Sequence, residues 1–215
     1  MIQPDKPQLL ATVFSDYICP FCYVGDVRLQ RLRADYDLKI NWCFLEIHPE
    51  TPAAGMAISK LGYPALQWRQ MMDNLAALAA EEGLDLRNHD FTTCSHRALL
   101  LAEAAREAGS EVFYRLHRRL FEAFFSEGRN IGDATELHTL ARECGLADDV
   151  VARAWDDPRY EQRLAHYRRS ASDLGVQATP TIFFGRQQRL DGVQPLHVFR
   201  EAAAAGFREQ NTGQG

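Results

Sequence analysis

Two cysteines separated by two residues are the feature of this chain with the clearest chemical meaning. Cys19 and Cys22 enclose Pro20 and Phe21, and they follow a short apolar segment. Pro20 suits the first turn of a helix, where the amide hydrogen that proline lacks would have no partner. A cysteine at a helix start meets free amide groups and positive potential, which favour the thiolate that attacks disulfides. The spacing therefore predicts a redox pair in which Cys19 attacks and Cys22, one turn along, resolves the mixed disulfide.

Two other interpretations of the pair stay open, half of a zinc site and a pair of inert thiols. A zinc site made of cysteines needs a second close pair, and the chain has five cysteines without one. Cys94 and His96 form another Cys/His cluster, at an expected helix start. Cys43 and Cys144 fall on apolar stretches, where buried, unreactive thiols are expected. We therefore expect no metal site.

The segments around the pair predict a strand, a helix and a strand. Residues 9–14 are apolar and partly β-branched, and residues 38–47 begin with apolar/polar alternation, so both predict strands. A helix over about 20–34 fits the apolar and long charged residues between them. Two strands joined through a helix favour a parallel pair.

The rest of the chain divides into a helical part and a closing unit. Residues 64–174 carry apolar residues at helical spacing, with Ser110 as an expected helix cap. Residues 180–184 and 189–190 then predict strands, 194–205 a last helix, and 211–215 a frayed tail. The layout predicts an α/β chain with a discontinuous domain (1–55 and 175–215) and an inserted helical domain (56–174).

The composition excludes several classes of protein. The 215 residues are 46% hydrophobic and 25% charged, which is ordinary for a globular chain and unlike a disordered one. The net charge of -5 argues against a nucleic-acid partner, which would favour a basic chain. No segment has the pattern of a signal peptide or a membrane span, so we expect no membrane association and a cytoplasmic location, where thiols stay reduced.

A proline near the end of the chain completes a familiar pattern. Thr179-Pro180-Thr181 lies at the entrance of the predicted strand at 180–184, and taken alone it predicts an ordinary trans proline. Together with the cysteine pair and the helical insertion, it resembles the DsbA-like branch of the thioredoxin superfamily. The resemblance is greatest to cytoplasmic FrnE-type proteins, which are related to 2-hydroxychromene-2-carboxylate isomerases and kappa-class glutathione transferases. It is carried by residues 13–25, 44–50 with Pro52 and Gly55, 95–97, 120–125, 130–131, 175–176 and 179–181.

The resemblance implies a thioredoxin fold with a large all-helical insertion and a cis Thr179–Pro180 bond packed beside Cys19. The backbone at this proline would pair with a bound peptide or thiol. We therefore expect Pro20, Phe21, Thr179 and Pro180 to contact the substrate.

The resemblance also raises the question of which group accepts the proton of Cys22. Related sequences place a buried carboxylate on the first strand, at the position that is Val13 here. Asp16, in the turn before Cys19, is the nearest carboxylate upstream and our candidate proton acceptor. The alternative is that Asp16 only caps the turn through backbone amides.

The function that the resemblance implies is thiol–disulfide oxidoreductase or disulfide isomerase, acting on protein or small-molecule disulfides. It requires no cofactor beyond the Cys19–Cys22 pair, with glutathione as a candidate co-substrate. A glutathione-dependent transferase or isomerase is the alternative, although there the second cysteine would have no task. A third hypothesis is a holdase that uses apolar surface near the pair. The sequence allows either a monomer or a homodimer.

Overall fold

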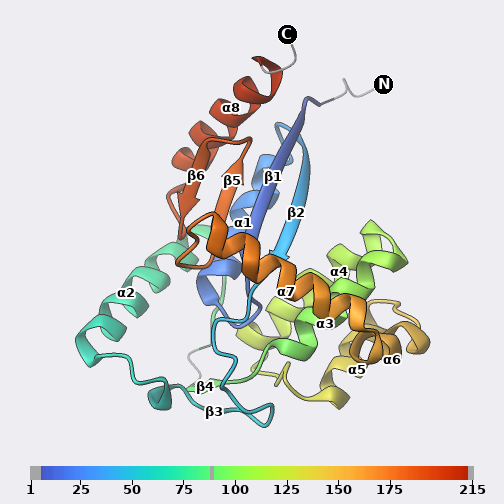
Figure 1. Cartoon of the computed structure of the whole chain (residues 1–215). Coiled ribbons are helices and arrows are strands. Elements are labelled where there is room, and N and C mark those ends of the chain that lie inside the picture. The colour runs from blue at the N-terminus through green and yellow to red at the C-terminus, as the bar shows by residue number, and fades with distance from the viewer. Residues whose placement is uncertain (1–5, 88–89, 213–215) are drawn as a thin grey trace.

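Four strands form one mixed sheet. The computed structural model describes residues 6–87 and 90–212 (Figure 1). The sheet has the order β2-β1-β5-β6, built from β1 (Gln8–Ser15), β2 (Asp37–Phe44), β5 (Thr181–Phe184) and β6 (Gln188–Asp191). β1 and β2 are parallel, as predicted, whereas β5 is antiparallel to both β1 and β6. This architecture is the α/β thioredoxin fold with a helical insertion that the sequence led us to expect.

The register of the central strands determines which loops meet. Phe14, near the end of β1, pairs with Thr181, the first residue of β5. Because the two strands are antiparallel, the chain leaving β1 and the chain entering β5 lie at the same edge of the sheet. Cys19 follows β1 and Pro180 precedes β5, so the topology brings these residues together from opposite ends of the sequence.

Two helices complete the sheet unit. α1 (Pro20–Leu32) buries Leu29 and Leu32 and ends two residues before the predicted boundary at 34. α8 (Leu196–Thr212) packs against β1, β5, β6 and α1. The predicted frayed tail is wrong for Asn211 and Thr212, which continue α8, and residues 213–215 lie outside the described residues. The helix extends because Gln210 is held at the sheet, where its amide pairs with Leu10 on β1.

The helical part lies below the sheet in the view of Figure 1. Its long helices are α3 (His96–Ala105), α4 (Ser110–Phe121), α5 (Ala134–Glu143), α6 (Asp148–Asp156) and α7 (Pro158–Asp173). A 3-10 turn, η2 (Arg106–Ala108), follows α3, and a π-helical turn, η3 (Glu122–Ser126), follows α4.

The helix starts in this part differ in the residue that caps them. Asp133 caps α5 by accepting hydrogen bonds from the amides of Thr135 and Glu136, at 2.8 and 3.0 Å. The expected cap at Ser110 is wrong, because Gly109 occupies the cap position and Ser110 is the first helical residue. Gly109 has a φ of 105°, which a serine would adopt only with strain, so the chain reverses at the glycine.

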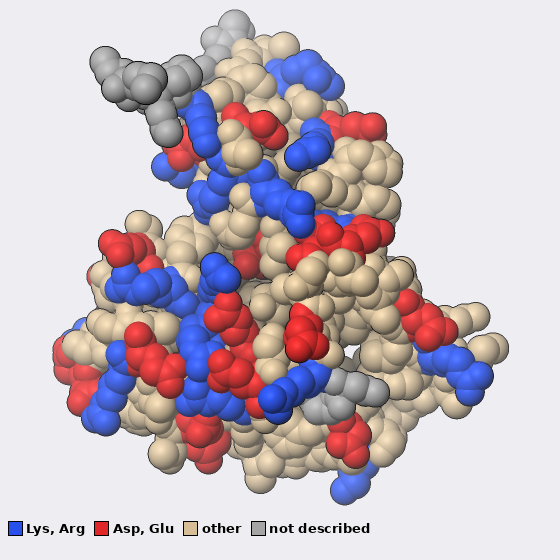
Figure 2. Space-filling view, turned by 180° about the vertical axis from the view of Figure 1, so that it is seen from behind, with Lys and Arg blue, Asp and Glu red and all other residues tan. Residues whose placement is uncertain are grey.

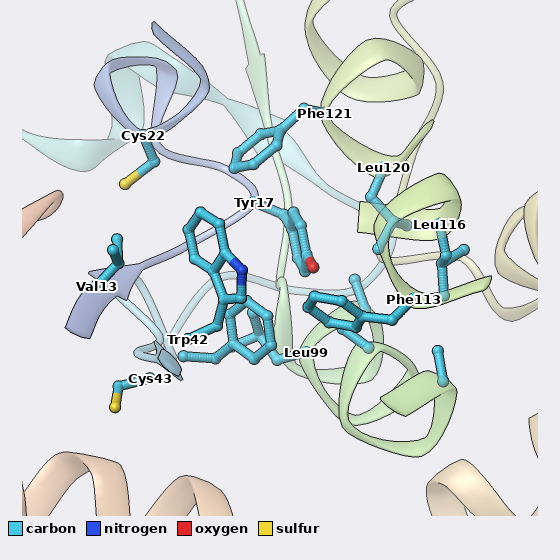
Figure 3. Packing of buried hydrophobic residues seen from close by; sticks show 14 of the residues in the cluster. Val13, Tyr17, Cys22, Trp42, Cys43, Leu99, Phe113, Leu116, Leu120 and Phe121 are labelled. Atoms are coloured by element: carbon cyan, nitrogen blue, oxygen red, sulfur yellow. The ribbon is translucent and has the colours of Figure 1, made fainter. Parts of the chain in front are cut away.

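Aromatic packing joins the helical part to the sheet. Figure 3 shows Trp42 of β2 and Tyr17 of the β1–α1 turn lying together among buried side chains from α3 and α4. The Tyr17 hydroxyl pairs with Nδ1 of the buried His117 at 2.8 Å, and the His117 ring lies 4.2 Å from that of Trp42. Because the β1–α1 turn leads directly to Cys19, this packing fixes the position of the cysteine pair.

α2 (Ala65–Glu82) stands apart from helices α3 to α7 (Figure 1). It follows β3 (Met56–Ala57) and the 3-10 turn η1 (Ile58–Leu61), and β3 pairs with β4 (Phe91–Thr92). The two-residue strands β3 and β4 are too short to produce a detectable alternation, so the sequence did not predict them.

The C-terminal half of α2 is attached to α1. Leu75 and Leu78 pack with Val24 of α1. Arg28 of α1, which is fully buried, donates from Nε to Glu82 at 2.9 Å and from Nη2 to Glu81 at 2.6 Å. A buried cation needs such partners to offset the cost of its desolvation. The helix that carries the cysteine pair thus also positions α2.

The surface carries charges of both signs. Figure 2 shows Lys and Arg side chains interleaved with Asp and Glu over the helical part. On α4, Arg115, Arg118 and Arg119 pair with Glu111, Glu122 and Glu127. This arrangement is a solvated helix face with paired charges. Within the described ranges, 6–87 and 90–212, no helix has the length and apolar character needed to span a membrane.

Candidate active site

Cys19 and Cys22 lie at the N-terminus of α1. Cys19 is the N-cap residue, with φ -91° and ψ 111°, and Pro20 follows as the first helical residue. Among the described residues, no side chain caps this helix start. The amide of Cys22 donates to the Cys19 carbonyl at 3.0 Å, so the second cysteine lies within the first turn. Both residues are buried, with exposures of 5% for Cys19 and 2% for Cys22.

Thr179 and Pro180 lie directly beside the first cysteine. The Cys19 thiol donates a hydrogen bond to the Thr179 carbonyl at 3.4 Å, and the Thr179–Pro180 peptide bond is cis. Pro180 also approaches α1 closely, because a Cβ added at Gly25 would lie 3.2 Å from the proline Cγ. The absent side chain at Gly25 therefore lets the proline loop lie against the helix of the pair.

The two thiols differ in acidity. Burial opposes ionisation of Cys19, but hydrogen bonds from the Cys22 thiol, the Thr179 side chain and the Cys22 amide outweigh it and lower the pKa of Cys19 below its usual value. Burial raises the pKa of Cys22 well above its usual value, and the neighbouring Cys19 raises it further. The site therefore holds one thiol that ionises easily next to one that stays protonated.

Asp16 is fully buried in the turn between β1 and α1. Its carboxylate oxygens accept hydrogen bonds from the amides of Ile18, at 3.3 Å, and Ile47, at 2.8 Å. Burial raises the pKa of Asp16 to about 7, although these amide donors favour the charged form. The carboxylate thus holds the turn before Cys19 and also titrates near neutral pH.

A large cavity opens beside the pair. Its volume is about 1240 Å³, and it extends from Cys19, Phe21 and Thr179 to α2. Trp68 and Met72 on the inner side of α2 line it. A concave, mostly apolar space next to a group with a shifted pKa is the usual form of a substrate site.

The architecture and this geometry agree with comparisons to known proteins. Residues 11–204 match the DsbA-like thioredoxin domain family. The chain belongs to the DsbA-like thioredoxin family. The DsbA-like chain is 26% identical to the Bacillus subtilis (strain 168) protein YwbO over 197 residues, which cover 88% of this chain and 93% of YwbO.

Solved structures support the assignment to the DsbA-like family. A probable DsbA oxidoreductase from Streptomyces coelicolor matches with a TM-score of 0.82 and 26% identity, covering 94% of this chain and 91% of that one. The cytosolic disulfide reductase DsbM from Pseudomonas aeruginosa, solved with GSH, has a TM-score of 0.63 and 18% identity, covering 95% of this chain and 98% of its own. The latter similarity shows the shared fold. Family and fold together make this DsbA-like protein a thiol oxidoreductase of that family.

The remaining cysteines of the chain are distant from the pair in sequence, and none of them has a lowered pKa. Cys43 and Cys144 are buried, and burial raises the pKa of Cys43 to about 11. Cys94 is half-buried, and its thiol donates to Glu46 at 3.6 Å. Within the described part of the chain, no group of three His, Cys, Asp or Glu side chains is placed to hold a metal ion.

His96 belongs to a charged cluster at the edge of the cavity. Its Nδ1 lies 2.9 Å from Glu46, a cavity-lining residue, and its Nε2 lies 2.5 Å from Glu161. The hydrogen bond to Glu46 raises the pKa of His96 to about 9, with a further contribution from Glu161. His96 is therefore a positioned cation that holds Glu46.

The part of the cavity wall that α2 forms could not be predicted from the sequence. Trp68 and Met72 fall within residues 64–174, where the helical spacing of apolar residues predicts a helix but not what its apolar face contacts. In the structure Trp68 and Met72 line the cavity, and Met72 also packs against the cluster of Val24, Leu75 and Leu78 that joins α2 to α1. The Trp and Met composition was the available signal, because adaptable methionines are common at binding surfaces.

Proposed function

We propose that this protein catalyses thiol–disulfide exchange on protein or small-molecule disulfides through Cys19 and Cys22. The observation that carries the proposal is the opposite shift in acidity of two thiols that share one helix start. A low-pKa thiol supplies the attacking thiolate, whereas a protonated thiol is a poor nucleophile and does not compete in the first step.

The exchange takes place in two steps. The Cys19 thiolate attacks one sulfur of the substrate disulfide, forms a mixed disulfide and releases the other sulfur as a thiolate. Cys22 loses its proton and attacks the Cys19 sulfur, so the Cys19–Cys22 disulfide forms and the second substrate thiolate leaves. The substrate is reduced to two thiols while the pair is oxidised, and the reverse sequence oxidises a dithiol.

Four residues are proposed to contact the substrate. The backbone of Thr179 and Pro180 lies beside Cys19. Pro20 and Phe21 line the cavity next to the cysteine pair. Small-molecule pockets typically measure about 300–1,000 Å³, so a cavity of about 1240 Å³ has room for a peptide segment or a tripeptide-sized thiol.

Asp16 is proposed as the acceptor of the Cys22 proton, directly or through water. A general base works best when its pKa lies near the operating pH, and burial raises the pKa of Asp16 to about 7. Its two amide contacts support the competing role of a turn cap. An Asp16→Asn substitution separates the two roles.

Glutathione is the candidate co-substrate. The structural neighbour DsbM was solved with GSH and is described as cytosolic, which supports both a glutathione-dependent reaction and a cytoplasmic location for this chain. A glutathione transferase or isomerase would use one thiol, whereas the dithiol mechanism needs both Cys19 and Cys22.

The test is equilibration of the protein with mixtures of reduced and oxidised glutathione, combined with single substitutions. We expect a reversible Cys19–Cys22 disulfide with a defined potential, and insulin reduction that is lost in Cys19→Ser. Cys22→Ser should trap the mixed disulfide. Full activity of Cys22→Ser in conjugating glutathione to an electrophile, without disulfide exchange in the unsubstituted protein, would favour the transferase instead.

A further inference from the structure

The cavity beside Cys19 contains a tyrosine that the exchange mechanism above does not use. Tyr63 lies between η1 and α2 and lines the same cavity as Cys19 and Thr179. Its exposure is 38%, so a bound substrate can reach it. Neither the cysteine pair nor the proline loop belongs to this segment, so Tyr63 approaches the cavity from a separate wall.

The Tyr63 side chain is held by neighbours on two sides. Its hydroxyl pairs with Nε2 of His48 at 3.2 Å, and Nδ1 of His48 lies 3.4 Å from Glu50. The phenol ring stacks on Trp68 of α2, with the ring centres 5.6 Å apart. These contacts give the hydroxyl a defined position in the cavity wall.

The hydroxyl remains a hydrogen-bond donor throughout the reaction. Burial raises the pKa of Tyr63, and negative charge on Cys19 raises it further. Tyr63 is thus protonated at neutral pH, and its hydroxyl hydrogen can be donated to a strong acceptor in the cavity. A thiolate formed in the cavity is such an acceptor, because hydrogen bonds to charged groups are stronger than those between neutral groups.

The cavity is the open side from which a substrate disulfide can reach Cys19. Thr179 occupies one side of the Cys19 sulfur, and the cavity lies on another. In thiol–disulfide exchange the attacking, central and leaving sulfurs lie nearly in line. A disulfide that approaches Cys19 through the cavity therefore directs its leaving sulfur into the space that Tyr63 borders.

We propose that Tyr63 is a catalytic residue whose hydroxyl donates a hydrogen bond to the thiolate that leaves when Cys19 attacks a disulfide. The inference rests on the proposed exchange function. In that step the Cys19–substrate sulfur bond forms, the substrate disulfide bond breaks, and the electron pair of the broken bond stays on the leaving sulfur. Tyr63 stabilises this anion without giving up its proton, and water later protonates the released thiolate.

The test compares leaving groups in the full-length chain. The first step is isolated in a Cys22→Ala background, with bis(2-hydroxyethyl) disulfide, which has a poor leaving thiolate, and 5,5′-dithiobis(2-nitrobenzoate), which has a good one. Tyr63→Phe should slow attack on the first about tenfold and on the second less than about twofold, because a basic thiolate gains most from a hydrogen bond. His48→Ala, which releases the hydroxyl, should give an intermediate loss.

Two controls distinguish this role from a structural one. Alkylation of Cys19 by iodoacetamide has no leaving thiolate, so Tyr63→Phe should not change its rate. Tyr36→Phe alters a tyrosine that packs on Phe207, outside the cavity lining, and should leave both disulfide reactions unchanged. Melting temperatures of all variants show whether the fold is retained.

The outcomes separate the inference from the function on which it rests. Equal rates in Tyr63→Phe and its parent with both disulfides would overturn the role of Tyr63 alone. Equal slowing of both disulfides and of alkylation would also overturn it, because the hydroxyl would then act on Cys19. Failure of the unsubstituted protein to react with either disulfide would instead overturn the proposed function.

Discussion

The thiol of Cys19 and the carbonyl of Thr179 lie 3.4 Å apart and form a hydrogen bond, although the residues are 160 positions apart in the chain. The antiparallel pairing of β1 and β5 creates this contact, because it brings the end of one strand to the start of the other. One consequence is that the group proposed to attack the substrate lies beside a peptide backbone that can pair with the substrate.

We predict that Cys19 is alkylated before every other cysteine when the reduced protein is treated briefly with iodoacetamide at pH 6. Its pKa is lowered, whereas burial and the proximity of Cys19 raise the pKa of Cys22. Cys94 is the informative control, because it is more exposed than Cys19 while burial raises its pKa. Peptide mass mapping gives the order, and earlier labelling of Cys22 or Cys94 would show that exposure outweighs acidity.

We predict a reduction potential of roughly -180 to -260 mV for the Cys19–Cys22 pair, between protein disulfide isomerase and thioredoxin. Phe21 contributes neither charge nor a hydrogen bond to the Cys19 thiolate, so the reduced state gains less than it would from a histidine. Phe21→His should make the pair more oxidising. Equilibration with glutathione measures both values, and a potential near the roughly -120 mV of DsbA would require another stabilising group.

We predict that Asp16→Asn slows resolution of the mixed disulfide by Cys22 and leaves the first attack by Cys19 as fast or faster. The asparagine cannot accept the Cys22 proton, and it removes a negative charge that raises the pKa of Cys19. Rapid-quench kinetics resolve the two steps. Unchanged rates and pH profiles with a lower melting temperature would identify Asp16 as a turn cap.

We predict that Asp16 makes stability depend on pH. Its pKa is about 7 in the folded chain, against 3.8 for a fully solvated aspartate, so the folded state holds a proton that the unfolded state releases between these values. The free energy of unfolding should therefore fall, relative to that of Asp16→Asn, as pH rises from about 4 to 7, by roughly 4 kcal/mol at most. Urea unfolding across this range measures the difference, which should be constant above pH 8. A parallel pH dependence in both proteins would contradict the shift.

We predict that Gly206→Ala destabilises the protein, although alanine favours helices over glycine by about 1 kcal/mol. Gly206 lies in α8, where an added Cβ would come within 2.6 Å of the Phe184 Cβ and 2.7 Å of its backbone. Strand backbone cannot move aside cheaply, so overpacking should cost about 1–3 kcal/mol. Thermal unfolding measures the net effect, with Ala205→Gly as a matched change in the same helix. A higher melting temperature in Gly206→Ala would show that α8 can shift away from β5.

Much of the sheet unit could be predicted from local sequence. The apolar run at 9–14, the proline at the start of α1 and the parallel pairing of β1 with β2 follow from patterns that a few neighbouring residues determine. Boundaries were less certain, since α8 continues to Thr212 where a frayed tail was expected. The contact that extends it joins Gln210 to Leu10, and no local pattern reveals a contact across the chain.

The sequence by itself determined that Cys19 and Cys22 share a helix start, because their spacing and Pro20 act within one turn. Only the tertiary structure decided how acidic each thiol is, since the pKa of each depends on burial and on neighbours such as Thr179. It also decided that the stripe of α2 faces a cavity with Tyr63 in its wall, since helical spacing shows that a face is apolar but not what it faces. The physical reason is that short-range preferences depend on adjacent residues, whereas desolvation and electrostatic interactions depend on every group that folding brings near.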